Sequence, residues 1–327
     1  MSARLLVAAL RDPESVALLD SAGWTALLTA ARAEQLLGSL AHRLDGLAVP
    51  AAAERVLTDA RAGAVEQRRA ALWEVEMAHR ALAPLDVPVV LLKGSAFVAA
   101  GLSAGVGRSI GDLDILVPQG ALPAVEAALL AAAWEWVKPD PYDDDYYRRW
   151  MHELPPLIHR ARDRMIDVHH TILPPTARPK PDAAALIADA VVLADNLRVL
   201  SPNDMLVHAA AHLFADGDLA GGLRNLWDVH RLIEEFGEHG LPARALHHGL
   251  ATESARAVRL ARHLYRAEES LNAIDRFYLR RLLARDGWGR QTRPITRLGF
   301  YIRSHWLRMP PALLARHLWT KWRKRPA

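Results

Sequence analysis

The sequence of 327 residues contains no cysteine. This absence excludes disulfide bonds, thiolate nucleophiles and cysteine-ligated zinc, because each of them needs a thiol. Long hydrophobic runs are also missing: no apolar stretch approaches the ~18 residues that a transmembrane helix needs. The N-terminal segment carries Arg4, Arg11, Asp12, Glu14 and Asp20, which is unlike a secretory signal peptide. We therefore expect a cytoplasmic protein.

What the sequence does contain is typical of a globular chain. Hydrophobic residues make up 51% and charged residues 24%, a balance that is unlike that of disordered proteins. Alanine, leucine and arginine dominate, whereas glycine and β-branched residues are sparse outside a central region. This mixture favours helix, and the length allows two domains.

The net charge of +4 hides an asymmetry between the body and the tail. Residues 276–327 hold 14 Lys or Arg against one acid, a balance of 14 − 1 = +13, so residues 1–275 carry 4 − 13 = −9. Trp288, Trp306, Trp319 and Trp322 lie among these basic residues. The tail could contact an acidic membrane surface or nucleic acid. It could equally neutralise the acidic body or form a solvated face, and we favour these two structural interpretations.

Hydrophobic periodicity divides the chain into an α+β core between two helical regions. We expect an N-terminal helical region over 1–84, an α+β core over 85–173, a C-terminal helical domain over 182–285 and a basic helical tail over 286–327. In the core we predict strands over 87–92, 112–117 and 134–138, helices over 96–100 and 122–133, a loop over 139–145 and a hairpin over 154–172. After a proline-rich linker, we predict helices over 183–193, 203–214, 223–236, 242–265 and 270–285.

Two motifs of the core carry the chemistry. Asp112 and Asp114 are spaced i, i+2 on a predicted strand, so their side chains share one face while the alternating apolar residues point into the core. Two neighbouring carboxylates repel each other unless a cation lies between them. A solvated strand edge would also explain the pair, but the preceding turn Lys93–Ser95 favours a phosphate and metal site.

A nucleoside triphosphate with magnesium would give each of these residues a physical role. Gly94 lets the backbone approach a phosphate, and the unpaired N–H groups of the helix after Ser95 favour an anion. Lys93 would add a positive charge, although it could also be a simple charge at the strand end. Asp112 and Asp114 would hold one or two Mg²⁺ ions, which prefer oxygen ligands and can clamp both oxygens of an in-line displacement.

Three further residues extend this candidate site. Asp167 is the natural third carboxylate if its strand lies beside the first pair, either as a metal ligand or as a general base. In His169-His170, one histidine shares the face of Asp167 and could orient a carboxylate, contact substrate or make a structural hydrogen bond. Arg108 could reach the triphosphate or make an ion pair that holds the acidic strand, and the sequence leaves both open.

Together these motifs resemble the polymerase-β-type nucleotidyltransferase superfamily. They are most similar to a bacterial family known as uncharacterised nucleotidyltransferases, with the pattern LKG … R … D-I-D-L-L-V … E/D-L-H. Members of this family usually carry an Arg and an Asp at this spacing on a downstream helix, and Leu223–Asp228 resembles that helix. The similarity covers about residues 85–235 and rests on Lys93–Ser95, Arg108, Asp112–Val117 and Ile166–His169.

The resemblance implies a small mixed-sheet nucleotidyltransferase core that moves NMP from an NTP, with ATP as the expected donor, and releases pyrophosphate. The acceptor would be a hydroxyl of a small molecule or biosynthetic intermediate. Gly94 and Ser95 would contact phosphates, and Asp112, Asp114 and Asp167 would bind metal. The gap from Ser95 to Asp112 is longer than in most of the superfamily, though similar to this family. Two alternatives are an inactive nucleotide-binding protein that acts through partners, and transfer to a protein or RNA docked by the tail.

Other polar residues receive structural interpretations. His208 and His212 have the i, i+4 spacing of a zinc site, but no acidic residue lies between them, and we favour helix packing. Arg224 and Asp228 are spaced for an intrahelical ion pair, which we favour over a contact of Arg224 with nucleotide. The acidic run 143–145 is expected to be a solvated loop rather than a metal site.

Overall fold

A seven-stranded mixed sheet organises the protein. The computed structural model describes residues 2–138, 140–268, 270–311 and 314–315. Within them the strand order is β3-β4-β5-β2-β1-β7-β6; β2 pairs with β5 and β1 with β7 in parallel, and the other neighbours are antiparallel. The strands are β1 (Val89–Leu91), β2 (Asp112–Leu116), β3 (Trp134–Trp136), β4 (Leu157–His159), β5 (Met165–His169), β6 (Val191–Ala194) and β7 (Leu197–Val199). The prediction of an α+β fold with a mixed sheet is confirmed.

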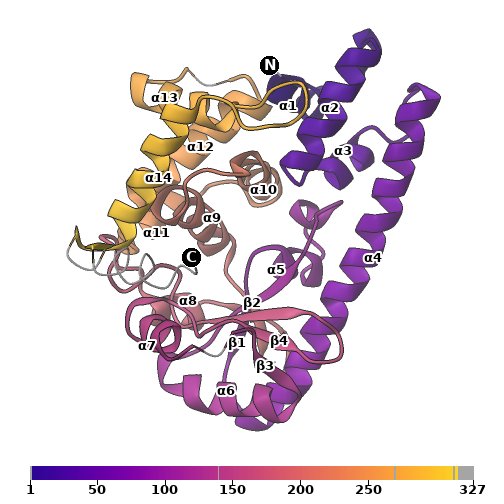
Figure 1. The fold of residues 1–327 in the computed structure, drawn as a ribbon. Helices are drawn as coiled ribbons and strands as arrows, with labels where there is room; N and C mark the ends of the chain where they lie inside the picture. Colours follow the sequence, from indigo (N-terminus) through magenta and orange to yellow (C-terminus); the bar gives the residue numbers. More distant parts are fainter. Residues whose placement is uncertain (1, 139, 269, 312–313, 316–327) are drawn as a thin grey trace, which may run out of the picture.

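Helices surround the sheet on both sides. They are α1 (Ser2–Arg11), α2 (Ser21–Ala33), α3 (Leu37–Arg43), α4 (Ala51–Leu82), α5 (Lys93–Ala99), α6 (Leu122–Ala131), α7 (Pro141–Trp150), α8 (Ala183–Ala188), α9 (Pro202–Ala211), α10 (Gly222–Phe236), α11 (Leu241–His247), α12 (Ala251–Tyr265), α13 (Ala273–Leu282) and α14 (Pro294–Arg308). In Figure 1, α6 lies below the sheet, and the N- and C-terminal helices lie together above it. None of these helices is long and apolar enough to cross a membrane.

The helical regions are joined to the sheet through shared contacts. Helix α4 has 32 residues and runs along one side of the molecule, where it packs against α5, α6 and β2 (Figure 1). Helix α1 contacts α12, and α10 contacts α9, α12 and the short 3₁₀ segment Ser103–Gly105. One hydrophobic cluster therefore extends from Leu10 through Ile115 to Phe214. The proposed domain limits stay a prediction, and the sheet includes strands beyond the range 85–173.

Four predicted elements are wrong. The helix expected over 242–265 is two helices, α11 and α12, because the chain turns between them at Gly249, which has a φ of 67°. The helix expected over 183–193 ends at Ala188, and its second half forms β6, because Val191 and Val192 are β-branched and a turn at Asp195 (φ 42°) returns the chain as β7. The acidic run 143–145 belongs to α7 and not to a loop, since Asp140 caps this helix and its first turn favours carboxylates. The helix after β1 begins at Lys93, so Leu92 and not Ser95 is its N-cap.

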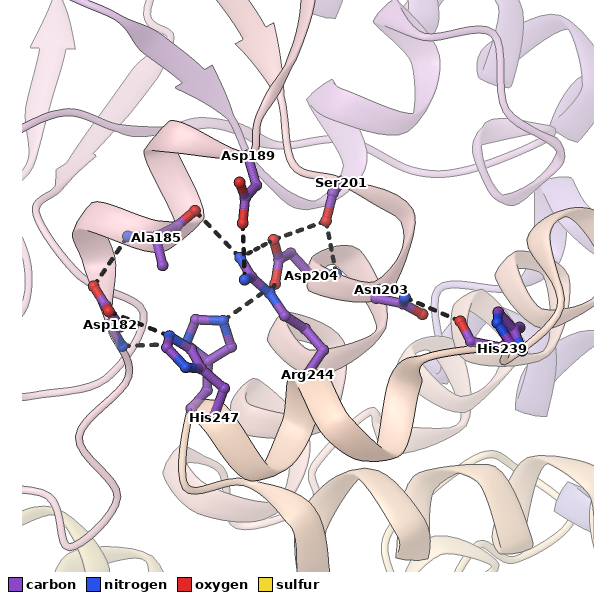
Figure 2. A network of polar contacts seen from close by, with 10 residues as sticks. Asp182, Ala185, Asp189, Ser201, Asn203, Asp204, His239, Arg244 and His247 are labelled. Atoms are coloured by element: carbon purple, nitrogen blue, oxygen red, sulfur yellow. Dashed lines mark hydrogen bonds and ion pairs between the residues drawn. The ribbon is translucent and has the colours of Figure 1, made fainter.

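A buried polar network holds the β6–β7 side of the sheet against the C-terminal helices (Figure 2). Arg244 of α11 donates from Nε and Nη2 to the two carboxylate oxygens of Asp204, at 2.6 and 2.7 Å, and its Nη1 lies 2.8 Å from Asp189. Asp204 is fully buried and also accepts from Ser201, while His248 Nε2 lies 3.2 Å away. These contacts fix α9 and α11 relative to the end of α8. Loss of any of them is costly, because an unpaired buried carboxylate is strongly destabilising.

Candidate active site

The parallel pairing of β2 with β5 brings the predicted carboxylates together. Asp114 lies directly opposite Asp167, and Asp112 lies opposite Met165. Since side chains alternate along a strand, all three aspartates share one face of the sheet. Asp114 is only 2% exposed, Asp167 is half-buried, and Asp112 begins its strand at the solvent-exposed end. The candidate site is therefore open at Asp112 and closed at Asp114.

Two basic side chains fix Asp114. Lys93 Nζ donates to Asp114 Oδ1 at 2.6 Å, and His169 Nε2 lies 3.0 Å from the same oxygen. Burial alone would raise the pKa of Asp114, but the charge of Lys93 and the hydrogen bond from His169 outweigh it and hold this pKa well below its usual range. For Lys93, burial acts to lower the pKa, but the charge of Asp114 and the hydrogen bond to it together outweigh burial, and the pKa of Lys93 is raised. The pair therefore stays ionised at neutral pH. Lys93 has a left-handed backbone, with φ of 49°, a strained conformation of the kind that clusters at functional sites.

The pKa values of the other two carboxylates, Asp112 and Asp167, are raised rather than lowered. Desolvation raises the pKa of Asp112, and the nearby charge of Asp114 raises it further. Burial raises the pKa of Asp167 to about 7, with further contributions from Asp114 and Glu153. In both cases negative charge is crowded on one face. A bound cation would relieve this crowding, and carboxylate oxygens are the ligands that Mg²⁺ prefers. The donor chemistry of the face thus fits the ion that the motifs predict.

The Gly94-Ser95 turn contacts the segment that leads into the aspartate strand. A Cβ at Gly94 would lie 2.5 Å from Arg108 Nε and 3.2 Å from Ile110 Cγ1, so only glycine leaves room for the arginine side chain. The hydroxyl of Ser95 is buried and donates to the carbonyl of Asp112 at 3.4 Å. Both residues thus support the start of β2, and their contacts with phosphate stay a prediction.

Arg108 makes an ion pair, but its partner is not on the acidic strand. Its guanidinium binds Asp228 of α10 and lies over the ring of Phe97, with Cζ 5.5 Å from the ring centroid. Asp228 also pairs with Arg224, and Arg224 Nη1 donates to Ser39 Oγ at 2.8 Å. The predicted intrahelical pair is therefore confirmed, and it is buried rather than exposed. This relay joins the loop before β2 to α10 and α3.

Two site residues were missed from the sequence, namely His152 and Glu153, in the segment after α7. Glu153 forms an antiparallel bridge with His169, and its Oε2 lies 3.4 Å from His169 Nδ1. The ring of His152 stacks on that of His169, with the centroids 5.1 Å apart. His169 is thus the histidine that orients a carboxylate, as one interpretation predicted, whereas His170 contacts the carbonyl of Met151. No periodic pattern marks residues 152 and 153, and only their place before the hairpin hinted at this contact.

Among the described residues, one group of histidines and carboxylates has ligand atoms that all lie within 4.8 Å of one another: His152, Glu153 and His169. The three aspartates are not such a group, so their side chains must converge to share an ion. Within the described part of the chain, His208 and His212 belong to no group of three or more such ligands. Burial lowers the pKa of both of those histidines, and both line a small cavity with Lys93, Arg108, Asn225 and Asp228. The interpretation of both histidines as helix-packing residues stays a prediction.

A mixed sheet with paired aspartates behind a Lys-Gly-Ser turn is the arrangement that the motifs predict for the nucleotidyltransferase class. The model of a family described as "uncharacterised nucleotidyltransferase" matches residues 20–266, and the chain belongs to this family. The match runs from α2 to the end of α12, so it includes helices on both sides of the central strands and leaves out α1, α13 and α14. The family is one of transferases, and this supports nucleotidyl transfer as the general activity. No curated protein matches the chain.

Proposed function

We propose that the protein is an Mg²⁺-dependent nucleotidyltransferase that moves NMP from an NTP to a hydroxyl group and releases pyrophosphate. ATP is the expected donor, and a small molecule or biosynthetic intermediate is the expected acceptor. The observation that carries the proposal is the shared face of Asp112, Asp114 and Asp167 in two adjacent parallel strands. Family membership supports the general class of reaction. A cytoplasmic location, where nucleotides are abundant, is part of the proposal.

The chain's own residues would divide the work as follows. Lys93 and His169 hold Asp114 in one orientation, so this carboxylate is preorganised to bind an ion. Asp112 lies at the open end, where a triphosphate can approach from solvent. Asp167, with a pKa near 7, is suited to accept a proton from the acceptor hydroxyl or to complete the ligand set. Magnesium, when bound, would neutralise charge on the phosphates and the attacking oxygen.

Pyrophosphate release tests this proposal. The wild-type protein, incubated with Mg²⁺, labelled NTPs and candidate acceptors, should release pyrophosphate, and the double variant Asp112→Ala, Asp114→Ala should lose this activity. Asp59→Asn, on the exposed face of α4, is the matched control and should behave as wild type. Equal activity of the double variant and wild type would refute the proposal. Binding of NTP without turnover by any acceptor would instead support an inactive nucleotide-binding protein.

A second proposal concerns the partner of the basic tail. We propose that α14 contacts an acidic membrane surface. Four large apolar side chains repeat along one face of this helix with helical spacing and are well exposed: Ile295 (86%), Leu298 (57%), Ile302 (59%) and Trp306 (48%). An apolar stripe beside arginines fits the boundary between lipid headgroups and acyl chains, whereas nucleic acid offers the aliphatic side chains no counterpart. Trp319 and Trp322 lie outside the described residues.

Vesicle binding tests the membrane proposal. The full chain should sediment with anionic vesicles, bind neutral vesicles weakly, and lose binding as salt is raised. The variant Ile295→Glu, Leu298→Glu should lose most of this binding, whereas Leu246→Glu, an equally exposed apolar position on α11 (71%), should not. Binding to RNA without binding to anionic vesicles would show that the partner of the tail is nucleic acid and would refute the membrane proposal.

A further inference from the structure

His169 and Glu153 face each other in a buried contact that needs a proton or a metal ion between them. His169 Nε2 lies 3.0 Å from Asp114 Oδ1, and because a carboxylate only accepts hydrogen bonds, we assign the ring proton to Nε2. The lone pair of Nδ1 then faces Glu153 Oε2 at 3.4 Å, and Nδ1 has no hydrogen-bond partner although His169 is only 3% exposed. Two electron-rich atoms do not remain in contact in a buried site unless a proton or a metal ion lies between them.

A second unpartnered nitrogen lies in the same place. Nδ1 of His152 is also buried without a hydrogen-bond partner, and its ring stacks on that of His169 at an interplanar angle of 29°. The ligand atoms of His152, Glu153 and His169 all lie within 4.8 Å of one another. Buried polar atoms are nearly always hydrogen-bonded, so two unpartnered nitrogens on the stacked imidazole rings of one cluster point to a missing ligand.

The backbone holds these side chains in register. The segment after α7 pairs with the end of β5: Leu154 N–H donates to the carbonyl of Val168 and His170 N–H to that of His152, both at 2.9 Å. Glu153 and His169 form the bridge between these two bonds. Neither partner strand can slide without breaking the backbone bonds, so the cluster is preorganised by the fold.

We propose that His152, Glu153 and His169 bind one divalent transition-metal ion of the zinc type. Two imidazoles and one carboxylate favour such an ion over Mg²⁺, which prefers oxygen ligands only. The distance of 3.4 Å between Nδ1 and Oε2 matches the edge of a tetrahedral site, which is about 3.3 Å for bonds of roughly 2.0–2.1 Å. The contact of His169 with Asp114 supplies the carboxylate–histidine–metal arrangement that orients a histidine ligand. This inference does not rest on the proposed function.

The site would act on its surroundings through His169. A metal ion on Nδ1 fixes the ring, and the ring in turn fixes Asp114 through Nε2. Three protein ligands leave a fourth position for water or another small ligand. The ion would also tie the segment after α7 to β5, beside the aspartates on the same face of the sheet.

Zinc titration of the metal-free full chain tests the proposal. In excess Mg²⁺, calorimetry should detect one Zn²⁺ per chain, with at least a tenfold loss of affinity in Glu153→Gln and in His152→Asn. His169→Gln should show the same loss, because glutamine can keep an N–H toward Asp114 but offers no Nδ1. The matched control is His170→Gln, the neighbouring histidine that contacts Met151 instead, and it should bind zinc as wild type does.

Two outcomes would overturn the proposal: no zinc binding by wild type, or binding that persists in Glu153→Gln and His152→Asn. In the second case, loss of binding in Asp112→Asn would place the ion on the aspartate face instead. Cobalt substitution gives a measurement that needs no variant, since Co²⁺ in the wild-type site should show the visible absorption of a tetrahedral, nitrogen-ligated ion. Its absence would also refute the site, even if a variant fails to fold. Pyrophosphate release with Mg²⁺ alone is measured separately, so the two proposals can fail independently.

Discussion

Replacing Asp167 with asparagine tests whether the aspartate face is destabilised by its own charge. Burial, together with the charges of Asp114 and Glu153, raises the pKa of Asp167 to about 7. Asparagine has nearly the same shape but no charge. We therefore expect Asp167→Asn to be more stable than wild type in metal-free buffer above neutral pH, and to bind Mg²⁺ more weakly at every pH.

The magnitude follows from proton linkage. The carboxyl of Asp167 binds its proton more tightly in the folded chain, with a pKa of about 7 against the ordinary value of 3.8. The stability that this provides is fully present below the unfolded pKa and is lost as the pH rises through the folded one. Between about pH 5 and about pH 8 the loss is up to roughly 2.5 kcal/mol, and partial solvent screening reduces the expected range to roughly 1–2.5 kcal/mol. The variant does not titrate, so its advantage over wild type should grow by this amount.

Urea unfolding with a chelator, at about pH 5 and about pH 8, measures this difference. Asp59→Asn is again the control, because it removes an exposed carboxyl group that lies on α4, outside the aspartate face. An advantage of Asp167→Asn that is the same at both pH values, or that is larger in acid, would refute the reasoning. Mg²⁺ at about a hundred times its Kd should add roughly 2.7 kcal/mol to wild type and much less to the variant.

Three further outcomes are expected. Lys93→Met leaves the buried carboxylate of Asp114 without its ion-pair partner and should lower the free energy of unfolding by roughly 3 kcal/mol in urea titrations; an unchanged midpoint would contradict this. Gly94→Ala places a Cβ against Arg108 Nε and should destabilise the protein by roughly 1–3 kcal/mol, whereas Gly63→Ala, with open space around it on α4, should not. The kcat/KM for pyrophosphate release should rise as the pH increases through about 7, since Asp167 must be ionised to bind metal or accept a proton; a flat profile would exclude that role.

Local patterns in the sequence predicted the parts of the site that depend on one strand or one turn. The spacing of Asp112 and Asp114 is enough to place both on one face, because strand side chains alternate. That Asp167 lies on a neighbouring strand could be inferred, but the register that sets it opposite Asp114 depends on the pairing of β2 with β5. Strand pairing is a tertiary property, and no single segment encodes it.

The misses have physical causes of the same kind. Alanine-rich residues before Val191 hid a β-branched pair whose strand conformation is stabilised by pairing with β7. The acidic run after Pro141 suggested a loop, although Asp140 followed by proline is a signal for a helix start. Arg108 and Asp228 are separated by 120 residues, so their ion pair could not be predicted from local spacing. Glu153 meets His169 only because the chain folds back beside β5.

The relay from Arg108 through Asp228 and Arg224 to Ser39 has a consequence for dissecting the protein. A truncated chain that starts at residue 85 would retain all three aspartates but would remove Ser39 from the buried guanidinium of Arg224. It would also remove Glu34, whose carboxylate accepts from Leu223 N–H at 3.2 Å and pairs with Arg285. The sheet that carries the aspartates is therefore not a portable module, and its sequence is expected to be inherited together with both helical flanks.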